Sequence, residues 1–435
     1  MSTKNIVVPY AQIQQAFHTD PAHLMEAVSQ SAAQAAGGDA ALQAQMIAAW
    51  NDAASALQKG DHGGVMSSAQ NDIASRLQSL IASKADEAGK TITTRGDVPV
   101  ITPNGTQSVS FGVREVKFDN EDLIGWLGMA WKLIFKPEKH AWIDPPAAPE
   151  TIADDGRIAV FADWGTGLYG APVIAQSIQK LDRCDVALHL GDTYYSGSDE
   201  EIHDRLVSDW PVRADGKTVN RSLNGNHEMY SGGAGYFDAL GDFFHQPASC
   251  FAMQNANWLL VCLDTAYVDF DLDPAQVAWL KAMVAAAGTR KLILFSHHQP
   301  FSQLDLQGPK LQVALADLLN QGRIHAWFWG HEHRLVLYDP HPKWGFKGRC
   351  IGNGGFPAFR DQLTATPSHV YVWVNMPTAP HAPAAQLLDG PNFWITEDPM
   401  RYSPHGFLTL DFDGANAWET YHMPDGIAVT PRNPL

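Results

Sequence analysis

Five short apolar runs in the second part of the chain each stop abruptly at polar residues. The runs, each with the polar residues at its end, are 158–162 before Asp163, 186–190 before Gly191 and Asp192, 259–263 before Asp264, 292–295 before Ser296 and His297, and 324–329 before Gly330 and His331. Unbroken runs of about five residues, apolar on both faces, are typical of strands buried inside an α/β sheet. Helical patterns at 274–287 and 311–319 lie between them. Because ligands collect beyond the carboxyl ends of such strands, we expect a functional site there.

The residues at these predicted strand ends are of the kinds that bind metal ions. Five segments carry them: Asp163-Trp164-Gly165, Gly191-Asp192-Thr193-Tyr194-Tyr195, Gly225-Asn226-His227-Glu228, Ser296-His297-His298-Gln299-Pro300 and Gly330-His331-Glu332-His333. Oxygen and nitrogen donors without a thiolate suit iron, manganese or zinc. Two separate carboxylates and three separate histidine segments exceed the needs of one four-coordinate ion, so we expect two metals that share a carboxylate. The glycines before Asp192, Asn226 and His331 allow sharp turns and a close backbone approach.

The charge of the chain limits its partners. Thirty basic residues against 47 acidic ones give a net charge of −17, and no block of lysine or arginine occurs. These values exclude electrostatic binding of nucleic acid and a polybasic membrane-surface protein. The apolar share of 45% and the charged share of 18% are those of a globular protein.

The chain divides into two regions at a stiff, proline-rich linker over residues 144–149. Residues 1–90 have mostly helical patterns, and residues 91–120 are rich in β-branched residues and turn signals that predict a hairpin. We therefore expect an N-terminal helical region with a β-hairpin over 1–150 and one catalytic domain over 151–435.

Three features predict a cytoplasmic protein. The N-terminus has no apolar stretch of signal-peptide length. The most apolar run, residues 123–135, is too short to cross about 30 Å of hydrocarbon. The 4 cysteines contain no CxxC pair and suit a reducing compartment.

Near the C-terminus, the proline-rich residues 361–404 are expected to form an irregular insertion that could act as a lid.

The ordered segments resemble the calcineurin-like metallophosphoesterases, and their pattern is most similar to that of the purple acid phosphatases. The blocks DxG, GDxxY, GNH(D/E), a strand-end histidine and GHxH occur here in this order, over about residues 155–335. Each block is weak alone, but the ordered set at strand ends is specific. The resemblance implies an α/β (α+β sandwich) fold, in which two packed mixed sheets are flanked by helices, preceded here by the mainly helical N-terminal region.

The resemblance also implies residue roles. The first metal would take Asp163, Asp192, Tyr195 and His333, and the second would take Asp192, Asn226, His297 and His331. The remaining roles are catalytic: His227 beside the substrate, Glu228 orienting His227, and His298 facing the substrate. Because a tyrosinate ligand favours Fe(III), the implied cofactor is Fe(III) with a divalent iron, zinc or manganese ion.

Two of these positions have alternatives. The commonest relatives have a metal-binding histidine at the position of Gly165, and here Tyr195 would take the place of that ligand. The adjacent Tyr194 weakens this inference, because neighbouring aromatic residues also occur where they only pack in the core. In the fourth block, alignment of the strand selects His297 as the ligand, whereas a strict H-x-P pattern selects His298.

The implied reaction is hydrolysis of a phosphate ester. Two cations roughly 3.5–4 Å apart would clamp phosphate oxygens and activate a water for in-line attack. We expect a phosphomonoesterase acting on a phosphorylated small molecule or a phosphoprotein. The alternatives are a phosphodiesterase for a cyclic nucleotide or a glycerophosphodiester, and a non-catalytic scaffold of the same fold. The N-terminal helices would then offer a protein-contact or oligomer surface.

Overall fold

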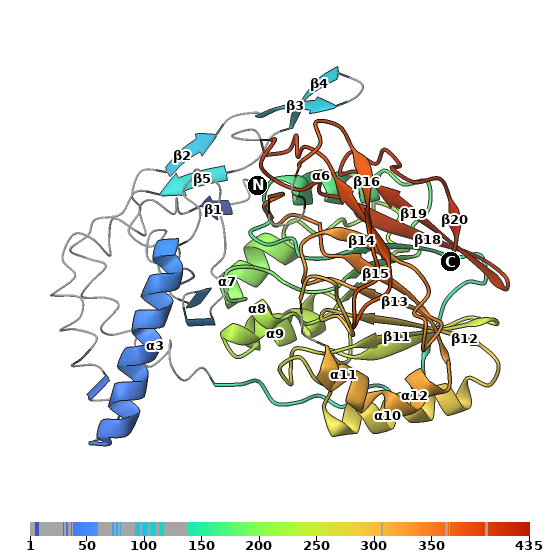
Figure 1. The fold of residues 1–435 in the computed structure, drawn as a ribbon, viewed down its shortest axis with the longest axis horizontal. Coiled ribbons are helices and arrows are strands. Elements are labelled where there is room, and N and C mark those ends of the chain that lie inside the picture. The colour runs from blue at the N-terminus through green and yellow to red at the C-terminus, as the bar shows by residue number, and fades with distance from the viewer. Residues whose placement is uncertain are drawn as a thin grey trace.

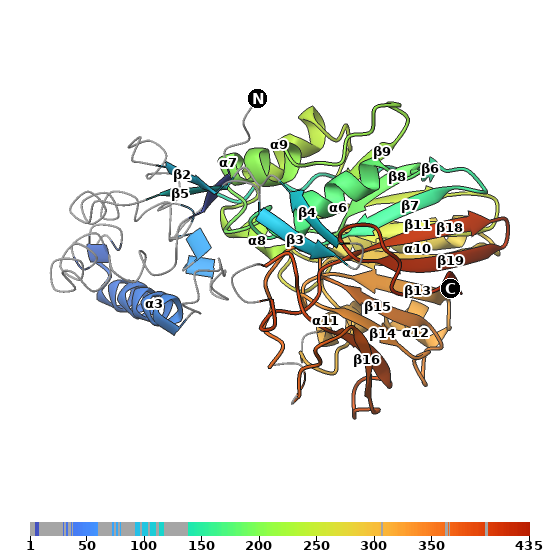
Figure 2. The same cartoon turned by 90° about the horizontal axis from the view of Figure 1, so that it is seen from above.

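The computed structural model describes two parts of the chain. The larger part is 138–435 without 306–307, 362–363, 365 and 396–398. Before it, the described residues are 5–7, 29, 32–33, 36, 38–59, 72–73, 75–76, 79, 92–95, 98–102, 105–109 and 113–116. Figures 1 and 2 show that the larger part is built around two β-sheets.

The larger sheet has nine strands among the described residues, in the order β16-β17-β14-β15-β13-β12-β11-β10-β6. Their bounds are β6 (Glu150–Thr151), β10 (Phe251–Gln254), β11 (Trp258–Leu263), β12 (Lys291–Ser296), β13 (Ile324–Trp329), β14 (Leu335–Tyr338), β15 (Lys347–Ile351), β16 (Val372–Met376) and β17 (Ala385–Asp389). The central strands β11, β12, β13 and β15 are parallel neighbours, while β14, β16 and β17 pair antiparallel. The sheet is therefore mixed.

The smaller sheet has six strands in the part of the chain that the structure describes, in the order β20-β19-β18-β7-β8-β9. Their bounds are β7 (Arg157–Phe161), β8 (Val186–His189), β9 (Val219–Ser222), β18 (Phe407–Asp413), β19 (Asn416–His422) and β20 (Asn433–Pro434). Strands β7, β8 and β9 are parallel, and β18 joins β7 antiparallel. The C-terminal strands thus complete a sheet that begins just after the linker.

The core lies between the two sheets, because alternate residues of each strand point to opposite faces. In β7, Ile158 and Val160 pack against β12 residues Ile293 and Phe295 of the other sheet. The alternate residues of each sheet pack on helices. These helices are α6 (Gly170–Gln179) and α9 (Ala234–Asp242) on the smaller sheet, and α10 (Pro274–Ala286), α11 (Pro309–Ala314) and α12 (Ala316–Asn320) on the larger one (Figure 2). The layered fold predicted from the resemblance is confirmed.

The described residues before 138 contain a helix and short strands. The helix α3 (Ala40–Lys59) begins after Asp39, whose carboxylate accepts the backbone N–H of Ala41 and Leu42 as an N-cap. Strands β3 (Val98–Thr102) and β4 (Gly105–Val109) form a hairpin, and β1 (Asn5–Val7), β2 (Ile92–Arg95) and β5 (Val113–Val116) form a small sheet. The apolar run 123–135 lies outside the described residues. Within the described part of the chain, no helix combines the length and apolar character needed to span a membrane.

The expectation of an irregular insertion over residues 361–404 is wrong at residues 372–376 and 385–389, which form strands. Strands β16 and β17 pair with each other and extend the larger sheet beside β14. Three of the seven prolines in this segment, at 377, 380 and 383, lie in the connection between the two strands. A buried ion pair anchors this segment: Arg360 Nε lies 2.7 Å from one oxygen of Asp389 and a terminal nitrogen lies 3.0 Å from the other.

Candidate metal centre

The predicted ligands gather where strands of both sheets end. Asp163 and Asp192 follow β7 and β8, and Asn226 begins the short helix α8 (Asn226–Tyr230) after β9. From the larger sheet, His297 follows β12, and His331 and His333 follow β13. Asp163, Asp192 and His297 are completely buried, and Asn226 and His333 are less than one-tenth exposed. Two sheets therefore contribute to one enclosed group of donors.

One half of the group is formed by Asp163, Asp192 and His333. His333 Nε2 lies 3.5 Å from Asp163 Oδ1. The carboxylate of Asp163 is held by the backbone N–H of His331, at 3.1 and 2.9 Å from its two oxygens. The hydroxyl of Tyr194 lies 2.6 Å from His333 Nε2 and 3.3 Å from Asp192 Oδ2. These oxygens and one imidazole form an oxygen-rich subsite.

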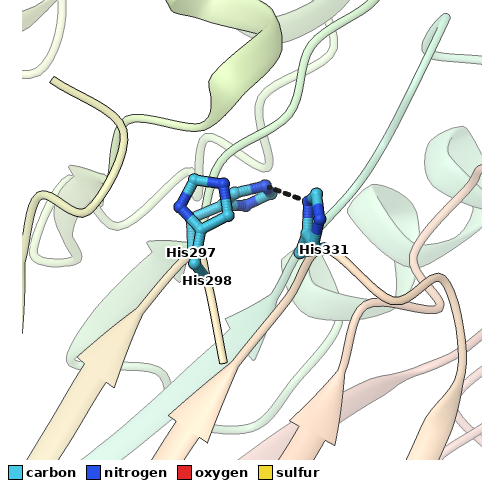
Figure 3. Close-up of side chains that lie close together, drawn as sticks. All are labelled: His297, His298 and His331. Carbon is cyan, nitrogen blue, oxygen red and sulfur yellow. Dashed lines mark hydrogen bonds between the residues drawn. The ribbon is translucent and has the colours of Figure 1, made fainter. Parts of the chain in front are cut away.

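The other half is formed by Asp192, Asn226, His297 and His331. His297 Nε2 lies 3.0 Å from Asn226 Oδ1, 3.2 Å from Asp192 Oδ1 and 3.2 Å from His331 Nδ1. Its Nδ1–H donates to the carbonyl of Leu190 at 2.9 Å, which leaves Nε2 for a metal. Figure 3 shows this histidine cluster, which also includes His298. The geometry supports His297 as the ligand.

The phenol in this group belongs to Tyr194, which corrects the assignment of Tyr195. The Tyr195 ring lies under the guanidinium of Arg205, 5.0 Å from its centroid, and the charges that act on its hydroxyl are those of Arg205, Glu201 and Tyr169. None of these belongs to the ligand group. The physical reason is that the Tyr195 ring packs under Arg205, which also donates to the Tyr194 carbonyl.

Glu228 does not orient His227, which corrects the expected role. Its carboxylate accepts the backbone N–H of Asp192 at 3.0 Å, of Thr193 at 2.8 Å and of Gly225 at 2.9 Å. Glu228 therefore fixes the segment that carries Asp192. His227 is oriented instead by the carbonyl of Tyr195, which lies 2.5 Å from Nδ1.

The backbone around the centre is unusually constrained. Asp163, Asp192, His331 and His333 have φ values of 53°, 73°, 67° and 50°, in the left-handed region that non-glycine residues seldom adopt. Such conformations persist only where the surrounding structure enforces them, and they concentrate at functional sites. The sequence predicted that the glycine before Asp192 allows a sharp turn and a close backbone approach, and the structure confirms both. Gly191 has a φ of 100°, and a Cβ at this position would lie 2.7 Å from the Gly225 nitrogen.

The donor set fits metal ions. Ligand atoms of Asp163, Asp192 and His297 lie within 4.8 Å of one another, and those of His297, His298 and His331 form a second such group. Burial raises the pKa of Asp163 well above its usual range. Burial alone would lower the pKa of His297, but the adjacent Asp192 carboxylate outweighs it and raises this pKa to about 9. Without a cation, the Asp192 carboxylate therefore favours the protonated form of the His297 imidazole, and a bound metal would replace that proton.

Several supporting residues were missed by sequence reasoning. Glu332 accepts the indole N–H of Trp329 at 2.9 Å and the hydroxyl of Ser302, which braces the segment between the two GHxH histidines. The Tyr230 hydroxyl accepts an N–H from the side-chain amide of Asn226 at 2.8 Å. This contact orients the amide so that its oxygen, Oδ1, faces His297. Glu332 stood in the variable position of its block, so no signal in the sequence pointed to it.

Comparisons with known proteins agree with the motif pattern. Residues 156–335 match the family model described as calcineurin-like phosphoesterase, which confirms the resemblance over that segment. No curated protein matches the chain.

Several solved structures are similar to the chain. GAP50, titled the anchor in the inner membrane complex of Plasmodium, is 13% identical over 65% of this chain and 88% of its own, with a TM-score of 0.44. A structure of PhoD is 10% identical over 66% of this chain and 70% of its own, with a TM-score of 0.41. Vps29 from Entamoeba histolytica is 11% identical over 64% of this chain and 99% of its own, with a TM-score of 0.29.

Proposed function

We propose that this chain, whose residues 156–335 carry the calcineurin-like phosphoesterase signature, is a metal-dependent hydrolase of phosphate esters. One observation carries the proposal: side chains from strand ends of both sheets bring two carboxylates, an amide oxygen and imidazoles into one buried group. The side chains that would hold two metals are Asp163, Asp192, Tyr194 and His333 on one side, and Asp192, Asn226, His297 and His331 on the other. Bound cations would neutralise phosphate charge and supply a nucleophilic water at neutral pH.

His227 is the residue that we assign to the leaving group. Its backbone N–H donates to Asp192 Oδ1 at 3.1 Å, and its ring lies on Tyr194 with the centroids 3.8 Å apart. Because Nδ1 is committed to the Tyr195 carbonyl, Nε2 is the ring atom that can exchange a proton with a leaving oxygen. The imidazole is thus oriented by the same loop that carries the ligands.

The substrate that we propose is a phosphomonoester on a small molecule or a phosphoprotein. The supporting argument is the purple acid phosphatase-like order of the motifs, together with a net charge of −17 that disfavours nucleic acid. A cytoplasmic location remains part of this proposal. Phosphodiester hydrolysis is the competing outcome of the test.

Paired assays on mono- and di-nitrophenyl phosphate test this proposal. We expect the metal-loaded protein to hydrolyse the monoester faster and a chelator to abolish the activity. Asn226→Ala should lose metal together with activity, whereas His227→Ala should keep its metal and lose about 10²–10⁴-fold in kcat. His203→Ala, at an imidazole whose side chain is 72% exposed, is the matched control and should behave as wild type. Hydrolysis of neither ester by the metal-loaded protein would overturn the proposal.

A second part of the proposal is an Fe(III) ion paired with divalent iron, zinc or manganese. It is supported by the Tyr194 phenol beside Asp192 and His333. An Fe(III)-loaded sample should show a visible tyrosinate charge-transfer band that Tyr194→Phe removes and Tyr195→Phe keeps. A band lost only in Tyr195→Phe would make Tyr195 the ligand, and absence of a band in wild type would exclude a tyrosinate–Fe(III) pair.

A further inference from the structure

We propose that His298 is an additional metal ligand, so that the subsite around His297 and His331 carries three imidazoles. The inference rests on the proposed function, since it concerns the same centre, but it moves His298 from the substrate to the metal. One ligand atom of each of these histidines lies within 4.8 Å of the other two. Figure 3 shows the three rings close together, with His297 and His331 joined by a hydrogen bond.

The orientation of the His298 ring leaves one nitrogen for a metal. Nδ1 lies 2.9 Å from the carbonyl oxygen of Thr265 and 3.0 Å from its hydroxyl, which in turn accepts the backbone N–H of His298 at 3.0 Å. A carbonyl can only accept, so Nδ1 carries the proton and Nε2 has the lone pair. His297 has the same arrangement, with its Nδ1–H donated to the Leu190 carbonyl. A backbone carbonyl behind Nδ1 is the usual support of a metal-binding histidine.

The lone pair on His298 Nε2 needs a partner. The side chain is completely buried, and Nε2 contacts no donor among the residues that the structure describes. An unsatisfied buried acceptor destabilises the folded protein, so a native site of this kind normally has an occupant. The ring is enclosed by Phe270, at a centroid distance of 4.0 Å, and by His331, at 4.7 Å. A lone pair attracts a cation and repels a phosphate oxygen, which favours the metal over the substrate as its partner.

This assignment makes the two subsites chemically different. One would offer three imidazoles, the Asn226 amide and a shared carboxylate, whereas the other offers two carboxylates, a phenol and one imidazole. Imidazole-rich sites favour zinc or divalent iron, and carboxylate-rich sites favour harder ions. We therefore expect the His298 subsite to select zinc or divalent iron over magnesium and calcium.

Calorimetric titration of the metal-free full chain with zinc tests the inference. Wild type should show two binding steps. His298→Ala and His298→Gln should weaken one step by at least about tenfold and leave the other unchanged. The glutamine amide can still donate to the Thr265 carbonyl, which preserves the local fold. His405→Gln, at another buried histidine outside the ligand group, should change neither step.

Zinc X-ray absorption gives a readout that does not depend on activity, because the variants should lose one imidazole scatterer. Two wild-type-like steps and unchanged scattering in both His298 variants would overturn the inference and leave the proposed function intact. Failure of wild type itself to bind zinc, iron or manganese would overturn both.

Discussion

Gly330 is the residue where the smallest change should most disturb the centre. A Cβ there would lie 2.5 Å from Asp163 Oδ2 and 3.0 Å from the Ala162 Cβ. The carboxylate cannot easily retreat, because the His331 N–H holds both of its oxygens. We expect Gly330→Ala to weaken metal binding at least about tenfold, measured as metal content after dialysis against a fixed free concentration.

Gly241 in α9 is the matched control for that substitution. A Cβ at Gly241 meets nothing within 4 Å, so Gly241→Ala should retain the wild-type metal content. Equal metal content in Gly330→Ala and Gly241→Ala would show that the Asp163 carboxylate is not confined as described.

His405 is a second residue with a testable consequence, because we expect it to make the stability of the folded protein sensitive to acid. The side chain is 1% exposed, and its Nε2–H donates to the Phe356 carbonyl at 3.0 Å. Burial lowers the pKa of His405 from 6.5 to about 4. The unfolded chain therefore binds this proton more tightly, and the stability contributed by the neutral ring is complete above about pH 6.5. It should fall by up to about 3 kcal/mol as the pH decreases from about 6.5 to 4.

Urea unfolding at pH 7 and pH 5 measures this effect. His405→Gln can keep the hydrogen bond without the titrating group, so its free energy of unfolding should change less between the two pH values than that of wild type. The same pH dependence in both proteins would contradict the assignment.

At the scale of elements, the loop between β8 and the short helix α7 (Asp199–Glu201) depends on Glu201. This buried carboxylate accepts the N–H of Ser196 at 2.9 Å and of Ser198 at 3.3 Å, and it pairs with Arg205 at 3.0 Å. It also accepts the hydroxyl of Ser79 at 2.9 Å, which ties the N-terminal region to the loop. The loop that carries Tyr194 is thus fixed from outside the centre.

Glu201→Ala should therefore destabilise the protein strongly. Removing one partner of a buried ion pair costs about 3–5 kcal/mol, because the remaining charge loses its compensation. The expected result is a lower urea midpoint. Asp317→Ala, which breaks the exposed pair with Lys281, should cost at most about 1 kcal/mol. Equal losses in the two variants would refute the role of Glu201.

Local signals in the sequence predicted the positions of strands and helices well, but they predicted the contacts between these elements poorly. The strand ends at Asp163, Asp192 and His297 could be predicted because burial on both faces and donor chemistry are properties of short segments. The choice between Tyr194 and Tyr195 could not be predicted, because it depends on tertiary contacts: the Tyr195 ring packs under Arg205, whereas the Tyr194 hydroxyl reaches Asp192 and His333. Likewise, Glu228 binds backbone groups, which leave no trace in the sequence.

For the whole molecule, the metal ions should join the two sheets. Asp163 and Asp192 follow strands of the smaller sheet, and His297 and His331 follow strands of the larger one. A ligand that binds only the folded state stabilises it by about 2.7 kcal/mol at one hundred times its dissociation constant. Chelation should therefore lower the thermal unfolding midpoint, and added zinc or manganese should restore it, as calorimetry can measure.

A double variant, Asn226→Ala with His297→Ala, provides the control for that experiment. It should respond less to metal than wild type, because two of the expected ligands are gone. Identical unfolding midpoints for chelated and metal-loaded wild type would show that the ions do not join the sheets.

The spacing of the ligands along the chain has a consequence for biogenesis. The first and last, Asp163 and His333, are separated by 333 − 163 = 170 positions, and strands of both sheets lie between them. A nascent or misassembled chain cannot present these donors together, so tight metal loading has to follow the completion of both sheets. Metal occupancy would then report correct assembly, and an incompletely folded molecule would stay inactive until its last ligand segment is in place.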